Sequence, residues 1–121
     1  ADRISWLVVG VGVNANVDPA DLPAEGATSI RAETGEVDRR AFTQRLLEEF
    51  DGLRNDPDAI IPAWREYAAT LGKRVRVETA GDEVVGEAVD VTYPGALVVD
   101  TGDGHVEVTA GDCEHLRAAD Q

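Results

Sequence analysis

The stretch KRVRVETAGDEVVGEAVDVTYPGALVVDTGDGHVEVT, residues 73–109, decides the fold of the C-terminal part of the chain. Apolar and polar residues alternate along it in short runs, which is the period of a half-buried β-strand. Turns that contain glycine separate the runs, and Gly-Asp-Gly at 102–104 is a strong hairpin signal because tight turns need positive φ. Four strands and a terminal segment within residues 73–121 predict a small SH3-like barrel. Gly86, inside the second strand, is expected to let that strand bulge and bend.

Upstream of Gly72 the apolar residues recur at helical spacing. Residues 38–53 predict a helix capped by Asp38, and residues 56–72 predict a second helix that Gly72 stops. Residues 14–37 read as a loop with one short helical turn in ATSIRAE. The apolar stripes of both helices are expected to be core rather than ligand-binding surface, and the same is expected of Trp6, Trp64 and Tyr67. The first stripe comprises Phe42, Leu46, Leu47, Phe50 and Leu53, and the second Ile60, Ile61, Trp64, Ala68 and Leu71.

The N-terminal run ISWLVVGVGV, residues 4–13, is apolar apart from Ser5 and two glycines, which predicts a strand buried on both faces. Its pattern Gly-x-Gly-x-x-Ala matches the dinucleotide-binding fingerprint, but Pro19 and Pro23 forbid the long helix that this fingerprint must open. The two glycines instead allow a backbone or a flat ligand to approach closely. Asn14 follows them and offers an amide that can both donate and accept hydrogen bonds.

Charge is the most marked feature of the composition. The chain has 24 acidic and 11 basic residues, a net charge of −13, and the acidic excess is spread along the sequence. Such a field repels phosphate backbones, which argues against general nucleic-acid binding. The sequence has one lysine, Lys73, and no methionine, which points to a protein adapted to high salt. The alternative is an ordinary acidic cytosolic protein.

No stretch is long and apolar enough for a membrane helix, and no secretory signal is recognisable, so we expect a cytoplasmic protein. The single cysteine, Cys113, cannot form an internal disulfide. With Glu114 and His115, Asp112 beside them and His105 nearby, it could be taken for a metal cluster. A structural zinc site needs four ligands at known spacings, so no metal site is expected here.

Five segments, taken in order, resemble the C-terminal half of a biotin–protein ligase, and the resemblance covers residues 4–117. These segments are VVGVGVNANV (8–17), ATSIRAETGEVDRRAFTQRLLEEF (27–50), WREYAATLGKRVRV (64–77), GEAVDVTYPGALVVDTGDG (86–104) and GDCEHLR (111–117). The resemblance implies an α+β fold. Residues 1–72 would be the C-terminal part of the ligase catalytic domain, namely a strand, a loop and two helices. Residues 73–121 would be the SH3-like C-terminal barrel.

The resemblance also implies a reaction and a site. Ligases of this family use biotin and ATP with Mg²⁺ to make biotinyl-adenylate, and then transfer biotin to a lysine of a biotin carboxyl carrier protein or carboxylase subunit. By the match of motifs, biotin would lie against the glycine strand and the adenylate against its end and the C-terminal barrel. The implied biotin-binding residues are Gly10, Val11 and Gly12, and the implied adenylate-binding residues are Val13, Asn14, Asp112 and Arg117.

Two elements on which this family's activity depends do not occur in the sequence: a glycine–arginine-rich loop and a lysine in a K-W-P-N-D-like segment. Such a site must above all supply positive charge beside the α-phosphate, which stabilises the negative charge that develops there. We therefore expect no catalytic residue in this chain, and activity only together with an N-terminal ligase half. A homodimer is also compatible with the resemblance. The alternative functions are a non-catalytic SH3-like interaction module and a module that senses biotinyl-adenylate.

Overall fold

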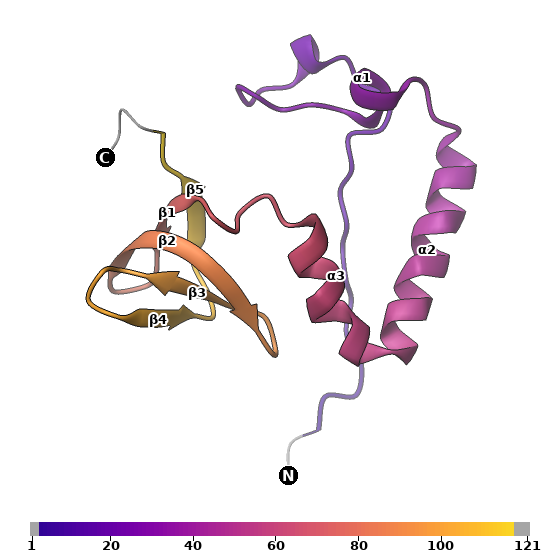
Figure 1. Ribbon diagram of the computed structural model, residues 1–121. Coiled ribbons are helices and arrows are strands. Elements are labelled where there is room, and N and C mark those ends of the chain that lie inside the picture. The colour runs from indigo at the N-terminus through magenta and orange to yellow at the C-terminus, as the bar shows by residue number, and fades with distance from the viewer. Residues whose placement is uncertain (1–2, 118–121) are drawn as a thin grey trace. The chain divides into compact units, whose positions relative to one another are not determined.

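The computed structural model describes residues 3–117, which belong to two compact units, Ala1–Asp51 and Gly52–Gln121 (Figure 1). The helices are α1 (Ile30–Thr34), α2 (Arg39–Asn55) and α3 (Ile60–Tyr67), with single 3₁₀ turns at Pro19–Asp21 and Pro57–Ala59. The strands are β1 (Arg74–Glu78), β2 (Glu83–Thr92), β3 (Ala96–Asp100), β4 (His105–Val108) and β5 (Asp112–His115). No helix within residues 3–117 is long and apolar enough to cross a membrane.

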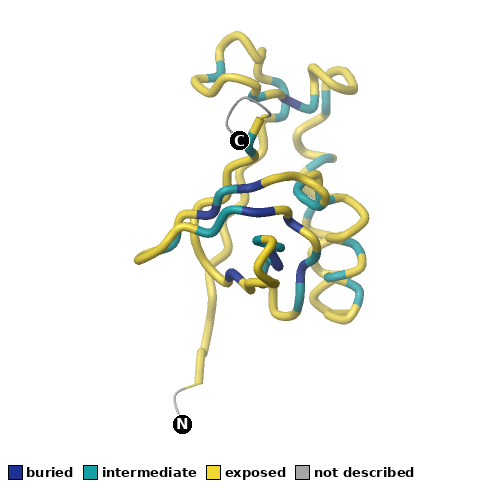
Figure 2. Tube along the Cα trace, turned by 60° about the vertical axis from the view of Figure 1, so that its left-hand side comes forward, coloured by how far each residue is buried: buried dark blue, intermediate teal, exposed yellow. Residues whose placement is uncertain are grey.

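The strands of the second unit form one antiparallel sheet in the order β4-β3-β2-β1-β5. The predicted four strands and terminal segment are therefore confirmed, and the terminal segment is the fifth strand. Alternate residues of the strands point inward and form the core, in which Val75, Ala88 and Val99 are fully enclosed. Figure 2 shows that the buried positions gather in these strands. Because β4 and β5 are the outermost strands, the sheet is an open version of the expected SH3-like barrel.

Gly86 has a different role from the one that the sequence suggested. The register of β2 against β3 shifts between Ala88 and Asp90, so the bulge lies at Val89 rather than at Gly86. Gly86 instead lies where the backbone of β3 leaves no room for a side chain, since a Cβ built on it would be 2.1 Å from the backbone oxygen of Asp100. The glycine is needed for this close approach of two strands.

The second helix is shorter than predicted, because α3 ends at Tyr67 rather than at Gly72. The sheet takes over the residues that follow it. The amide of Gly72 donates to the carbonyl of Ala88 over 2.8 Å, and the amide of Ala88 donates to the carbonyl of Lys73 over 2.9 Å. Continuing the helix would break these ladder bonds, so tertiary pairing overrides the helical pattern. Gly72 still has the positive φ of a residue that terminates a helix.

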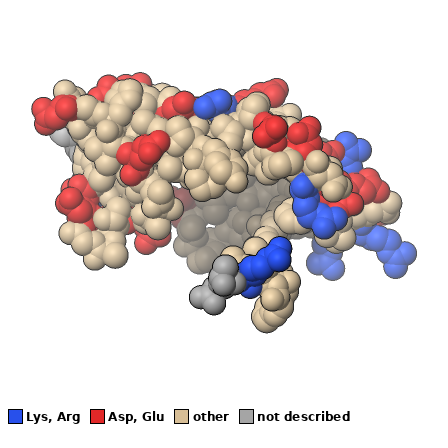
Figure 3. All heavy atoms as spheres, turned by 90° about the horizontal axis from the view of Figure 1, so that it is seen from below, with Lys and Arg blue, Asp and Glu red and all other residues tan. Residues whose placement is uncertain are grey.

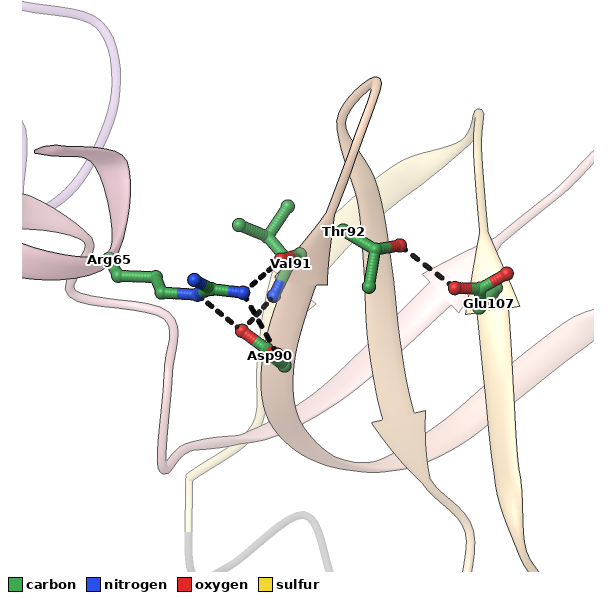
Figure 4. Close-up of polar contacts among 5 residues, drawn as sticks. All are labelled: Arg65, Asp90, Val91, Thr92 and Glu107. Carbon is green, nitrogen blue, oxygen red and sulfur yellow. Dashed lines mark hydrogen bonds and ion pairs between the residues drawn. The ribbon is translucent and has the colours of Figure 1, made fainter. Parts of the chain in front are cut away.

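Arg65 joins α3 to the sheet through Asp90 (Figure 4). Its Nε donates to Oδ1 of Asp90 over 2.7 Å, and its Nη2 donates to Oδ2 over 3.2 Å and to the carbonyl of Val91 over 3.1 Å. The same carboxylate accepts the amide of Val91 over 2.8 Å. The hydrogen bond from Arg65, followed by that from the Val91 amide, lowers the pKa of Asp90. This paired arrangement fixes one helix face on the bulged part of β2.

The Asp90→Asn substitution is expected to lower the urea midpoint of the second unit at pH 7, because an amide cannot accept the paired bond from Arg65. The pKa of Asp90 is lowered in the folded chain, so its stabilisation is present at neutral pH and is lost as pH falls below about 4. The unfolding curves of the unaltered chain and of the Asp90→Asn variant should therefore converge in acid. Asp103→Asn, in the β3–β4 turn, is the matched control, and equal midpoints for both variants at pH 7 would contradict this account.

The first unit begins with an extended segment that the structure does not place in a sheet. Residues 4–13 were predicted as a strand buried on both faces, but no described strand pairs with them and their side chains are exposed, Val8 by 83%. The prediction is wrong for this chain because burial on both faces needs neighbouring strands and covering layers.

The expectation that Trp6 and Tyr67 are core residues is also wrong, since they are 77% and 81% exposed. Trp64 is more enclosed, with 39% exposure.

The helices of the first unit follow their sequence signals. Oδ1 of Asp38 accepts the amides of Arg40 and Ala41, which confirms the predicted cap of α2. The predicted short turn is α1, whose first residue follows the capping residue Ser29. The apolar stripe of α2 is not buried as predicted, because Leu47 and Phe50 are largely exposed and nothing in the described chain covers them. Acidic side chains are spread over the face in Figure 3, as the sequence indicated.

Candidate functional site

The end of the extended segment is held against α1 by its own backbone. The carbonyl of Asn14 accepts the amide of Ile30 over 2.9 Å, and the carbonyl of Ala15 accepts the amide of Arg31 over 2.8 Å. The side-chain amide of Asn14 donates to the carbonyl of Thr28 over 3.3 Å. These bonds satisfy the first amides of a short helix, which otherwise lack partners. They place the residues after Gly12 beside the start of α1.

A hollow of about 380 Å³ lies between these two parts of the first unit. It brings together three of the seven predicted site residues. The segment side of the hollow is formed by Gly12, Val13 and Asn14, and the α1 side by Thr28, Ser29, Ile30, Glu33 and Thr34. The volume is in the range of small-molecule pockets.

Val11 lies on the other side of the segment. In an extended chain alternate side chains point in opposite directions, and Val11, Val13 and Ala15 line a second hollow of about 220 Å³ against α2. Arg39 and Phe42 are among the α2 residues there. These side chains face α2 without being buried by it, since Val11 and Val13 are 63% and 47% exposed. By the same alternation Gly10 and Gly12 lie on the opposite face.

Neither Gly10 nor Gly12 is required by the described chain itself. Both have φ outside the left-handed region, and a Cβ built on either would meet nothing within 4 Å. Gly86 and Gly111 contrast with them, because an added Cβ there would lie 2.1 and 2.4 Å from a backbone oxygen. The open space at Gly10 and Gly12 is therefore available for a group that approaches the backbone from outside the described chain.

The α1 side of the hollow carries the polar groups. Thr28 Oγ1 donates to Oε1 of Glu33 over 2.7 Å, and Oγ of Ser29, a residue only 3% exposed, accepts the amide of Ala32. A carboxylate and hydroxyl oxygens accept hydrogen bonds from N–H and O–H groups. The hollow thus combines a bare backbone edge with the exposed carboxylate of Glu33, which can accept hydrogen bonds from a polar ligand.

The remaining predicted residues, Asp112 and Arg117, belong to the second unit. Asp112 begins β5, pairs with Glu78 of β1, and lines a shallow hollow beside Gly111. Arg117 is exposed and follows the last paired strand. Cys113 is also exposed, and desolvation raises the pKa of its thiol, which disfavours the thiolate form.

The structure adds residues that the sequence reasoning missed. Ser29 and Glu33 line the hollow, and Asn16 holds the loop behind it. Asn16 stands two positions after Asn14, and in an extended chain residues at this spacing point to the same face. This spacing is the one feature of the sequence that could have indicated Asn16. Ser29 and Glu33 look like ordinary helix-start residues, since serine caps and acidic first turns are common.

The chain is similar to known proteins over most of its length. Residues 70–116 match the family model "Biotin protein ligase C terminal domain". The biotin–[acetyl-CoA-carboxylase] ligase of Mycobacterium tuberculosis is 34% identical over 117 residues, covering 93% of this chain and 44% of that protein. The bifunctional ligase/repressor BirA of Bacillus subtilis is 30% identical over 122 residues, covering 93% of this chain and 38% of that protein.

Solved structures agree on the fold. The biotin protein ligase from Aquifex aeolicus in complex with biotin and ATP aligns with a TM-score of 0.66 at 20% identity, covering 89% of this chain and 48% of that one. The apo form of the same ligase aligns with a TM-score of 0.65. This chain spans less than half the length of the curated relatives that it matches. The predicted resemblance is confirmed: residues 70–116 match the C-terminal domain of biotin protein ligases, and 93% of the chain aligns with part of such a ligase.

Proposed function

We propose that this chain forms part of an enzyme that activates biotin with ATP and transfers it to a lysine of a biotin carboxyl carrier protein. Its own contribution is one wall of the biotinyl-adenylate site. Gly10, Val11 and Gly12 would lie along biotin, Val11 through its backbone. Val13 and Asn14 would meet the adenylate at the end of the segment.

One observation carries this proposal: two glycines stand in an extended apolar run where the described chain gives neither a steric nor a conformational reason for glycine. A flat ring system that packs on the backbone supplies the reason, because a Cβ on that face would hold it away. The hollow at Gly12 and Asn14 supports the same assignment, with acceptor groups of α1 at its other side.

We further propose that residues 1–72 complete the catalytic domain and residues 73–121 form the C-terminal barrel. The family match, which starts at residue 70, supports a functional boundary there. Asp112 and Arg117 would then approach the nucleotide from the barrel, an assignment that rests on the resemblance of GDCEHLR to the end of the family's barrel.

The remaining features of the working enzyme are also proposals. ATP would be used with Mg²⁺, the reaction would take place in the cytoplasm, and the partners would be the carrier protein and an N-terminal ligase part. A homodimer is compatible with the family. The net charge of −13 favours folding in concentrated salt, where self-repulsion is screened.

Biotin transfer to a carrier domain tests the proposal. The chain is assayed alone and together with an N-terminal ligase part, with biotin and Mg-ATP in molar salt. We expect activity in the mixture and none from the chain alone, because the sequence contains no glycine–arginine-rich loop or K-W-P-N-D-like segment.

Each other outcome has a distinct meaning. Transfer by the chain alone would show that its own residues supply the cations that the α-phosphate needs. No transfer in either sample, with both proteins folded, would overturn the proposal and favour a non-catalytic interaction module. Binding of biotinyl-adenylate without any transfer would favour the sensing module.

A further inference from the structure

Asn16 makes an unusual pair of hydrogen bonds in the first unit. Its Nδ2 donates to the carbonyl of Val37 over 2.8 Å, and its Oδ1 accepts the amide of Val37 over 2.9 Å. One side-chain amide thus satisfies both backbone groups of a residue 21 positions away. Asn16 and Val37 are both partly buried, so these bonds are protected from competing water.

The bonds join the two ends of the loop that forms the hollow. Asn16 follows the segment that contributes Gly12, Val13 and Asn14, and Val37 lies in the connection between α1 and α2. Arg31 adds a third link, since its Nη1 donates to the carbonyl of Asn16 over 3.3 Å. Backbone hydrogen bonds already hold the start of α1 against Asn14 and Ala15. The bonds from Asn16 to Val37 hold the chain that follows the end of α1.

We propose that Asn16 is a positioning residue for the biotin site: by clasping Val37 it sets the spacing between the glycine segment and α1. It does not touch the ligand and acts through the two sides of the hollow. This inference rests on the proposed function, and it adds a residue to which that function assigns no role. A carboxamide suits this task because its donor and acceptor match the two backbone groups in one plane.

The Asn16→Asp substitution tests the idea through pH. A protonated carboxyl group can still donate to the Val37 carbonyl and accept its amide, whereas the ionised form faces the carbonyl oxygen with no donor. Facing that oxygen disfavours the charged form of the introduced carboxyl, whereas the Val37 amide and the guanidinium of Arg31, which donates to the Asn16 carbonyl, favour it. The donor half of the clasp is therefore present at low pH and is lost as pH rises through the pKa of this carboxyl.

The first measurement uses the chain alone and reads the geometry. The Val37 amide resonance in NMR spectra should titrate with pH in the N16D variant and stay constant in the unaltered chain. Asn55→Asp, the same change at the end of α2, is the matched control and should leave Val37 unaffected. A Val37 resonance that does not respond in N16D would overturn the clasp.

The second measurement uses the chain mixed with an N-terminal ligase part. The KM for biotin of N16D should rise about tenfold relative to the unaltered mixture at pH 8, with kcat changed less, and the difference should shrink as the pH falls toward the pKa of the introduced carboxyl. The N55D mixture should show a ratio near one throughout. A flat N16D ratio in an active mixture would overturn the positioning role. Inactivity of the unaltered mixture would instead contradict the proposed function. The NMR titration would still test whether Asn16 makes its hydrogen bonds to Val37.

Discussion

The Gly86→Ala substitution is expected to unfold the sheet of the second unit. A Cβ on Gly86 would lie 2.1 Å from the backbone oxygen and 2.7 Å from the carbonyl carbon of Asp100, and 2.9 Å from Cγ1 of Val99. These atoms cannot move aside, because β2 lies between β1 and β3 and is paired to both. Forcing the strands apart costs about 3 kcal/mol or more, which is a large share of the stability of a domain this small.

Chemical unfolding followed by circular dichroism in molar salt measures this effect. Gly81→Ala is the matched control, because Gly81 lies in the β1–β2 turn, has no positive φ, and a Cβ there meets nothing within 4 Å. It should change the free energy of unfolding by no more than about 0.5 kcal/mol. Equal stability of the two variants would mean that β2 and β3 are not held as close at Gly86 as the structure shows.

The Gly12→Val substitution is expected to abolish most biotin transfer at low biotin concentration without unfolding the chain. Its Cβ meets nothing within 4 Å and its φ is not left-handed, so the chain itself accommodates the larger side chain. A ligand packed against this face does not. If the added side chain weakens biotin binding by about 1–3 kcal/mol, the usual cost of overpacking, the KM for biotin rises roughly tenfold to a hundredfold.

The measurement is transfer by the chain mixed with an N-terminal ligase part, at varied biotin concentration. Gly52→Val is the matched control, because Gly52 lies in α2, has open space around it, and has no predicted role in binding. It should leave the KM within about twofold of the unaltered chain. If G12V binds biotin as tightly as G52V does, the glycine face is not a ligand surface.

The sheet could be predicted from the sequence because its signals are local. Alternating residues in 73–109 and the glycine-containing turns fix strands and hairpins between neighbours in the chain. The limits of the prediction appear where distant residues decide. The end of α3 at Tyr67 depends on the pairing of Gly72 and Lys73 with Ala88, and the bulge at Val89 depends on the register against β3.

The candidate site was only partly visible in the sequence. Gly10, Gly12 and Asn14 stood out because glycines in an apolar run need a reason, but the residues that face them across the hollow did not. Ser29 and Glu33 come from a segment more than a dozen positions away, which hydrogen bonds from α1 and from the Asn14 side chain bring there. The prediction that residues 4–13 are buried was wrong. Apolar residues show that a segment can be buried, but they do not show which other segment covers it.

Hydrogen–deuterium exchange on the mixture of this chain and an N-terminal ligase part, with and without biotin and Mg-ATP, tests the central claim most directly. The account predicts that ligand slows exchange at the amides of residues 10–14 and 28–34, while the amides of α3 stay unchanged. Slower exchange elsewhere, with residues 10–14 unaffected, would contradict the claim that the glycine segment forms a wall of the biotinyl-adenylate site.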